Sequence, residues 1–153
     1  RDGITLALLA YGAAAPFGNT LGGTLSDRVG PARLLVLICL VLMIVQASFL
    51  ALPMPGVLLI PLIFFWSLVG WLFGPPQQVR LVALSPERAA VLMSLNAGAL
   101  YVGIAGGSAF GSLALGWIGT EAVVLWSVVG LFGAVVVLLW SHRAANLRAA
   151  GQG

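Results

Sequence analysis

Five long apolar segments, separated by short turns rich in Gly, Pro and Ser, account for most of the chain. They predict helices over residues 4–26, 32–52, 57–82, 86–117 and 121–140. A helix needs about 20 residues to cross the hydrocarbon core of a bilayer. Lipid-exposed backbone must satisfy its own hydrogen bonds. A β-barrel would instead alternate over segments of about ten residues, whereas the run at 34–38 is apolar on both faces. We therefore predict transmembrane helices.

Composition supports an all-α membrane protein and excludes several other classes. The chain is 61% hydrophobic and 7% charged, whereas soluble domains average about 25% charged residues. A soluble enzyme or a disordered linker is therefore excluded, and the single Cys39 allows no disulfide scaffold. No stripe of basic residues suits nucleic acid. We expect residues 1–153 to form a partial transmembrane bundle that contacts the lipid bilayer, with 141–153 as a tail.

The arginines predict the orientation of the helices. Six of the seven arginines lie near the turns after the first and third helices or after the fifth helix. They are Arg28, Arg33, Arg80, Arg88, Arg143 and Arg148, while Arg1 precedes the first helix. The turns after the second and fourth helices contain no Lys or Arg. Five crossings put the arginine-bearing connections on one side, which the positive-inside rule makes cytoplasmic. The tail at 141–153 is then cytoplasmic, and the expected location is a bacterial inner membrane.

The five predicted helices are of two kinds. Those over 32–52 and 121–140 are almost wholly apolar and suit lipid contact, whereas those over 4–26 and 86–117 are rich in glycine. Small residues let helices approach closely in lipid. The candidate packing glycines are Gly12, Gly22, Gly103, Gly107 and Gly111. For any single pair, static packing is the simpler interpretation. Two such helices in one set favour a surface that slides or rocks.

Uncharged polar and aromatic residues within the helices are candidates for lining a cavity. They are Tyr11, Asn19, Trp66, Trp71, Ser94, Asn96, Tyr101 and Ser108. Two of them, Asn19 and Asn96, lie at comparable depth, where an amide either bonds to another helix or contacts a substrate. The sequence at 74–76, Gly-Pro-Pro, interrupts the third helix. It predicts either a kink at the membrane edge or a hinge in a discontinuous transport helix.

Catalytic chemistry is not indicated anywhere in the sequence. It contains no metal-ligand or nucleotide-binding motif, and His142 lies beyond the last predicted helix, where an interfacial role is favoured. We therefore expect no enzyme activity, no cofactor and no metal. No charged residue lies at the centre of a predicted helix, so this chain offers no candidate proton carrier.

The turn after the first helix carries a motif that narrows the field. Residues 22–30 read GGTLSDRVG and closely resemble the major facilitator superfamily signature G-x-L-x-D-R-x-G-R-[RK]. The matching residues are Gly23, Leu25, Asp27, Arg28 and Gly30, while Pro31 and Ala32 replace two expected basic residues. Residues 74–80 and 94–111 look like the tenth and eleventh spans of the arabinose-efflux-like branch of the drug/proton antiporters.

This resemblance implies a fold and a function. The five helices are similar to spans 8 to 12 of a twelve-helix carrier, so the N-terminal half of the same transporter is the implied partner. The implied function is secondary active transport by alternating access, most simply proton-coupled efflux of a small molecule such as a drug, a sugar or a related metabolite. The matched motif implies a conformational switch in which Asp27 faces the N-terminus of a helix in the other half.

Two other classes of function compete with this interpretation. A non-transporting membrane scaffold or interaction subunit could pack through the Gly-rich faces. A small oligomeric channel would require a charged or carbonyl-lined constriction, which the predicted helices lack. The scaffold is therefore the main alternative.

Overall fold

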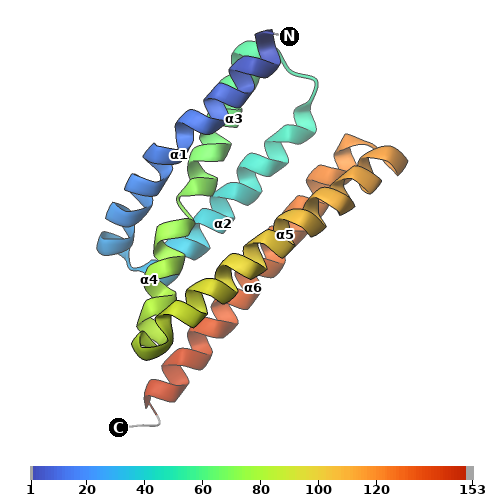
Figure 1. The fold of residues 1–153 in the computed structure, drawn as a ribbon. Coiled ribbons are helices and arrows are strands. Elements are labelled where there is room, and N and C mark those ends of the chain that lie inside the picture. The colour runs from blue at the N-terminus through green and yellow to red at the C-terminus, as the bar shows by residue number, and fades with distance from the viewer. Residues whose placement is uncertain (1, 151–153) are drawn as a thin grey trace.

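The protein is an elongated bundle of helices in this computed structural model, which describes the backbone of residues 2–150 and the side chains of residues 3–144 (Figure 1). Arg1 and residues 151–153 of the predicted tail lie outside the described residues, as does the side chain of Arg148. In chain order the elements are α1 (Asp2–Val29), α2 (Pro31–Ser48), η1 (Phe49–Ala51), α3 (Gly56–Trp71), α4 (Gly74–Leu84), η2 (Pro86–Arg88), α5 (Ala89–Trp117) and α6 (Thr120–Ala150).

Five segments within the described range are long and apolar enough to cross a membrane. They are Gly3–Val29, Pro31–Ala51, Gly56–Leu84, Pro86–Trp117 and Thr120–Ala144. Helices α3 and α4 together form the third of these segments. The predicted fold class, an all-α membrane protein with five transmembrane helices, is confirmed.

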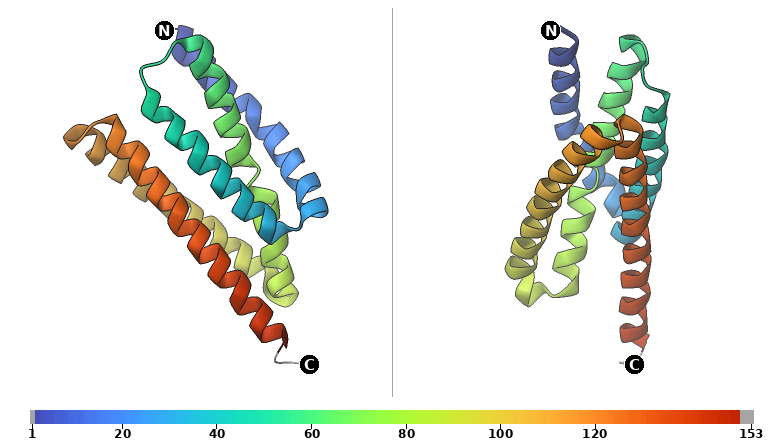
Figure 2. Two further views of the ribbon diagram at one scale, coloured as in Figure 1. Left: turned by 180° about the vertical axis from the view of Figure 1, so that it is seen from behind. Right: turned by 90° about the vertical axis from the view of Figure 1, so that its right-hand side faces the viewer.

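Successive segments run in opposite directions, so the connections gather at two ends of the bundle. The α1–α2 turn, the α4–α5 turn and the C-terminal end of α6 lie at one end, while the α2–α3 and α5–α6 connections lie at the other (Figures 1 and 2). Helix α6 continues to Ala150 rather than ending near Trp140. The stretch after Trp140 contains no glycine or proline before Gly151, and Ala, Leu and Arg favour helix.

Two glycines make short connections between helices possible. Gly30, between α1 and α2, has a φ of 90°, and Gly119, between α5 and α6, has a φ of 101°. Side-chain-bearing residues rarely adopt such angles. Pro31 then occupies the first turn of α2, where its missing N–H costs nothing. In the α4–α5 turn, Ser85 makes no side-chain capping bond, and its carbonyl accepts a hydrogen bond from the backbone N–H of Arg88.

Helix α1 packs closely against the third crossing. A Cβ atom added at Gly18 would lie 2.6 Å from Cβ of Trp71 and 2.7 Å from the carbonyl oxygen of Leu68. At Gly22 it would lie 2.7 Å from the carbonyl oxygen of Leu72. Contacts below 3.0 Å are shorter than real Cβ atoms make. Both positions therefore require glycine for this approach of the two backbones.

A small core stands beside this contact. Leu34, Ile38 and Val69 are buried together, and the partly buried side chains around them are Leu25, Leu42, Leu72 and Phe73. These residues come from α1, α2 and the third crossing. The core therefore fixes the end of α1 and the start of α2 against the junction between α3 and α4.

The predicted packing glycines have different surroundings. Gly22 is in close contact with the third crossing, and Gly18, which was not predicted, makes the same kind of contact. Gly12, Gly103, Gly107 and Gly111 have no atom of the described chain within 4 Å of an added Cβ. Their role in helix packing stays a prediction, and it concerns a partner other than these five helices.

We expect Gly22→Ala to lower the stability of the purified protein by about 2 kcal/mol, because its methyl group meets a backbone carbonyl that cannot move freely. Gly130→Ala is the matched control, since Gly130 lies in helix α6 with open space around it. The control should be neutral or gain up to about 1 kcal/mol from helix propensity. Thermal unfolding in detergent measures both, and equal stability of the two variants would contradict the close approach.

Candidate functional site

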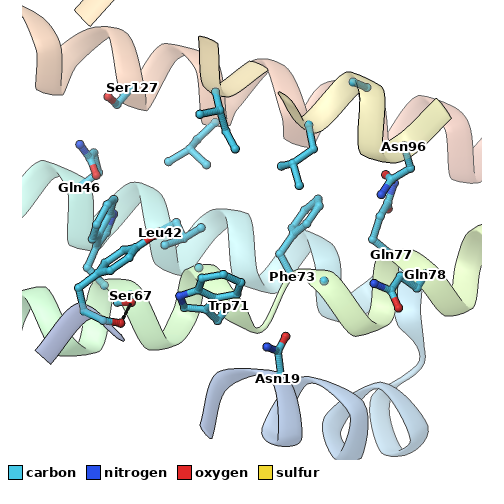
Figure 3. Close-up of a pocket in the computed structure, with 18 residues that line it drawn as sticks. Asn19, Leu42, Gln46, Ser67, Trp71, Phe73, Gln77, Gln78, Asn96 and Ser127 are labelled. Carbon is cyan, nitrogen blue, oxygen red and sulfur yellow. Dashed lines mark hydrogen bonds between the residues drawn. The ribbon is translucent and has the colours of Figure 1, made fainter. Parts of the chain in front are cut away.

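A cavity of about 880 Å³ lies between the α1–α3–α4 group and the α5–α6 pair. Every crossing contributes to its lining (Figure 3). The lining residues are Tyr11, Asn19, Leu42, Gln46, Trp66, Ser67, Gly70, Trp71, Phe73, Gly74, Gln77, Gln78, Asn96, Ala99, Leu100, Ile104, Ser127 and Leu131. Its volume is in the range of small-molecule sites, which span about 300–1,000 Å³.

The break in the third crossing lies on the wall of this cavity. Helix α3 ends at Trp71 and α4 begins at Gly74, so the interruption at residues 72–73 comes directly before the predicted Gly-Pro-Pro sequence. Pro75 and Pro76 carry no N–H, so the carbonyls of Trp71 and Leu72 lose the donors that a continuous helix supplies. The space left by Gly22 accommodates the Leu72 carbonyl.

Aromatic rings gather around Trp66. Its ring centroid lies 6.2 Å from that of Tyr11, with the planes tilted by 37°. It also lies 6.3 Å from the ring of Phe49, edge to face at 86°. Next to Trp66, the buried Ser67 donates a hydrogen bond of 2.8 Å from Oγ to the backbone carbonyl of Tyr11. This bond connects α3 to α1 and fixes Tyr11 at the cavity.

Carboxamide side chains gather at another part of the cavity, beside the break. Gln77 of α4 donates from Nε2 to Oδ1 of Asn96 on α5, at 3.5 Å. The second amide oxygen of this pair, Oε1 of Gln77, is buried without a hydrogen-bond partner in the described chain. Asn19 of α1 places its Oδ1 3.6 Å from the position of a Cβ on Gly74. Figure 3 shows Gln77, Gln78 and Asn96 at one end of the view and Gln46 and Ser127 at the other.

No described lining residue carries a charge. The polar groups that reach the cavity are amides, hydroxyls and indoles, which bind a ligand through neutral hydrogen bonds and aromatic contact. Away from this lining, Arg80 of α4 donates a hydrogen bond of 2.6 Å to Oγ of Ser141 on α6. Both side chains are half-buried, and their bond connects α4 to α6 directly.

The structure brings together some of the predicted lining residues and separates others. Tyr11, Asn19, Trp66, Trp71 and Asn96 line the cavity. The remaining three, Ser94, Tyr101 and Ser108, lie on exposed parts of α5 and do not line it. Sequence reasoning did not select Gln46, Ser67, Gln77, Gln78 and Ser127. The available signal for them was the rarity of amide and hydroxyl groups in strongly apolar helices.

The motif at the end of α1 has a buried part and an exposed part. Leu25 packs on the core, and Ser26 is buried, with no partner for its Oγ among the described residues. Asp27 and Arg28 are exposed. Gly30 makes the turn described above. The carboxylate is therefore accessible to another part of a larger assembly.

Comparison with curated proteins finds a relative named as an uncharacterized MFS-type transporter, YbcL of Bacillus subtilis (strain 168). The chain is 30% identical to it over 148 residues, which cover 91% of this chain and 35% of the relative. This similarity supports membership of the major facilitator superfamily. The chain spans about a third of the length of this relative. No family model and no solved structure matches the chain.

A superfamily relationship agrees with the kind of site that the structure shows. The relative is named as a transporter rather than an enzyme, and the cavity offers binding groups without a nucleophile–base pair. Among the described residues, no cluster of His, Cys, Asp and Glu could hold a metal ion. The similarity does not favour the scaffold alternative.

We expect Ser141→Ala to lower the stability by about 1 kcal/mol, because the half-buried Arg80 guanidinium loses a hydrogen-bond partner. The matched control is Ser48→Ala, whose exposed hydroxyl donates only to a carbonyl of its own helix, that of Ile44. Thermal unfolding of the two variants in the same detergent measures the difference. If Ser141→Ala unfolds at the wild-type temperature, the Arg80 bond contributes nothing to the attachment of α6.

Proposed function

We propose that the chain forms most of one half of a secondary active transporter that moves uncharged small molecules by alternating access. The observation that carries this proposal is the cavity of about 880 Å³ whose described lining has no charged side chain. In a chain built from membrane-crossing helices, such a cavity provides an environment for a solute between two aqueous sides. The similarity to an MFS-type transporter supports the same function.

The solute that fits this lining has an apolar body and neutral hydrogen-bonding groups. Aromatic surface comes from Trp66, Trp71 and Tyr11. The amides of Asn19 and Asn96 offer both hydrogen-bond donors and acceptors. A charged solute would enter a cavity with no compensating charge, at a high desolvation cost. Drugs, sugars and related metabolites without net charge are therefore the proposed substrate class.

We propose that the broken third crossing acts as the hinge of this half. Discontinuous helices at a cavity are a recurring feature of secondary transporters. Here the break carries cavity residues on both sides, Trp71 before it and Gln77 after it. A rotation at residues 72–73 would therefore change the cavity directly, whereas a kink remote from the cavity would not.

We further propose the direction, coupling and location of transport. The proposed transport is proton-driven efflux across a bacterial inner membrane, and the resemblance to drug/proton antiporters supports it. The proposed cytoplasmic C-terminus is supported by the placement of the arginines in alternate connections. We propose that the five crossings correspond to spans 8 to 12 of a twelve-helix carrier, with the N-terminal half as their partner. The group that carries the proton is proposed to lie in that half, because the cavity lining described here has no titratable carboxylate or histidine.

The exposed carboxylate of Asp27 is proposed as a latch to the other half. A carboxylate facing the N-terminus of a helix gains about 0.3–1 kcal/mol. Such a weak contact can be made and released during a transport cycle. Leu25 and Gly30 hold the latch in place, through core packing and a tight turn respectively.

Two variants distinguish the cavity from the latch in an efflux assay. Cells producing the natural protein are loaded with an uncharged fluorescent compound or with a cationic analogue of similar size, and export is followed over a range of loading. We expect export of the uncharged compound. Asn96→Leu removes hydrogen bonds to the solute and should raise KM by about two- to tenfold, since a lost hydrogen bond costs about 0.5–1.5 kcal/mol in the bound state.

Asp27→Asn lies outside the cavity and serves as the comparison. It should lower the maximal rate several-fold while leaving KM near the wild-type value, with the same amount of protein in the membrane. Preferential export of the cationic analogue, or an Asn96→Leu variant with unchanged KM, would contradict the proposed cavity. Unchanged export by Asp27→Asn would remove the latch from the mechanism and leave the cavity standing. Export that persists when the proton gradient is collapsed would contradict the proton coupling and would leave the cavity and the latch standing.

A further inference from the structure

A second hollow lies at the arginine-bearing end of the bundle, between the ends of α1, α2 and α6. It is a groove of about 350 Å³. Its walls are mainly aliphatic, from Val29, Val36, Leu37 and Leu139, and its two basic residues are Arg33 and His142. The groove shares no lining residue with the larger cavity. The groove is therefore a separate site.

The order of these residues along the helices matches the boundary between lipid tails and headgroups. Arg33 is in the first turn of the apolar segment Pro31–Ala51, and His142 and Arg143 follow the apolar run of α6 that ends at Trp140. Val36, Leu37 and Leu139 lie about one turn farther into these segments. The basic rim of the groove thus lies at the ends of the apolar segments, and its aliphatic floor lies about one turn inside them.

The aliphatic walls and the basic rim remain exposed. Leu37 is 49% exposed, Leu139 is 43% exposed, and Arg33 and His142 are both exposed. Arg143, next to the rim, adds a further positive charge. The acidic residue nearest in sequence, Asp27, does not line the groove. This surface is complementary to a molecule that combines an anionic group with an apolar chain.

We propose that this groove binds one anionic phospholipid, with the phosphate held by the Arg33 guanidinium and the His142 imidazole and an acyl chain along the aliphatic floor. Guanidinium groups bind phosphate oxygens in a paired geometry, and basic pockets between membrane helices recognise anionic headgroups. The lipid bridges α2 and α6, which meet along this side of the bundle. This site is independent of the proposed transport function.

A lipid retention experiment tests the site. The natural protein is reconstituted in nanodiscs that contain equal amounts of phosphatidylglycerol and phosphatidylcholine with identical acyl chains, and bound lipid is identified by native mass spectrometry. The wild type should retain phosphatidylglycerol in preference to phosphatidylcholine. Arg33→Gln should reduce the retained phosphatidylglycerol about fivefold, the effect of losing one basic residue near the surface.

Arg88→Gln is the matched control, because Arg88 is an exposed arginine at the same end of the bundle and outside the groove. It should retain phosphatidylglycerol at the wild-type level. If Arg33→Gln does not fold, His142→Ala tests the same rim and should also lower retention. Equal retention of both lipids by the wild type would overturn the proposal. So would equal loss in Arg33→Gln and Arg88→Gln, or displacement of the lipid by millimolar inorganic phosphate, which would indicate a simple anion site.

Discussion

The interruption of the third crossing at residues 72–73 is the constraint on which the rest of the structure depends. Backbone within a bilayer must have its polar groups satisfied or buried in protein. Two prolines remove helical donors at this point, and α1 covers it because Gly18 and Gly22 let its backbone approach. A larger residue at either position would separate α1 from the break. The break and the glycines therefore require each other.

This arrangement produces the cavity as a consequence. Because α1 contacts the third crossing so closely, Tyr11 and Asn19 reach the same space as Trp66 and Gln77. The α5–α6 pair encloses that space from the other side. Its polar contacts to α4 are the hydrogen bonds that Asn96 accepts from Gln77 and Ser141 accepts from Arg80. Ala114 is the only buried residue of α5 among those described. Most of α5 therefore presents its surface to lipid or to a partner outside this chain.

The sequence was sufficient for the helices and their order. Apolar segments of bilayer length are unambiguous, and the Gly30 turn and the Gly-Pro-Pro sequence predict a connection and a break from local backbone chemistry alone. The start of the last helix at Thr120 follows from Gly119 in the same way. The far end of α6 was less predictable, since polarity was taken as the end of the helix, whereas helix propensity continues past it.

The site was predictable only in part, because it depends on which helix faces which. Asn19 and Asn96 were recognisable as amides in apolar helices, and both line the cavity. Asn96 and Tyr101 were both predicted to line the cavity, although five residues separate them by about 140° around the helix. Which of the two sides of α5 faces the cavity could not be derived from one sequence, and Tyr101 is 70% exposed. Likewise Gly18 and Gly12 look alike in the sequence, and only the pairing of α1 with the third crossing distinguishes them.

The most direct test of the account asks whether α3 and α4 form one crossing in spite of the break. Single cysteines replace Asp27, Pro55 or Pro86 in a variant of the natural protein whose Cys39 is alanine, and a membrane-impermeant maleimide is applied to right-side-out and to inverted vesicles. We expect positions 27 and 86 to react from the same side and position 55 to react from the opposite side. Reaction of positions 27 and 86 from opposite sides would contradict it.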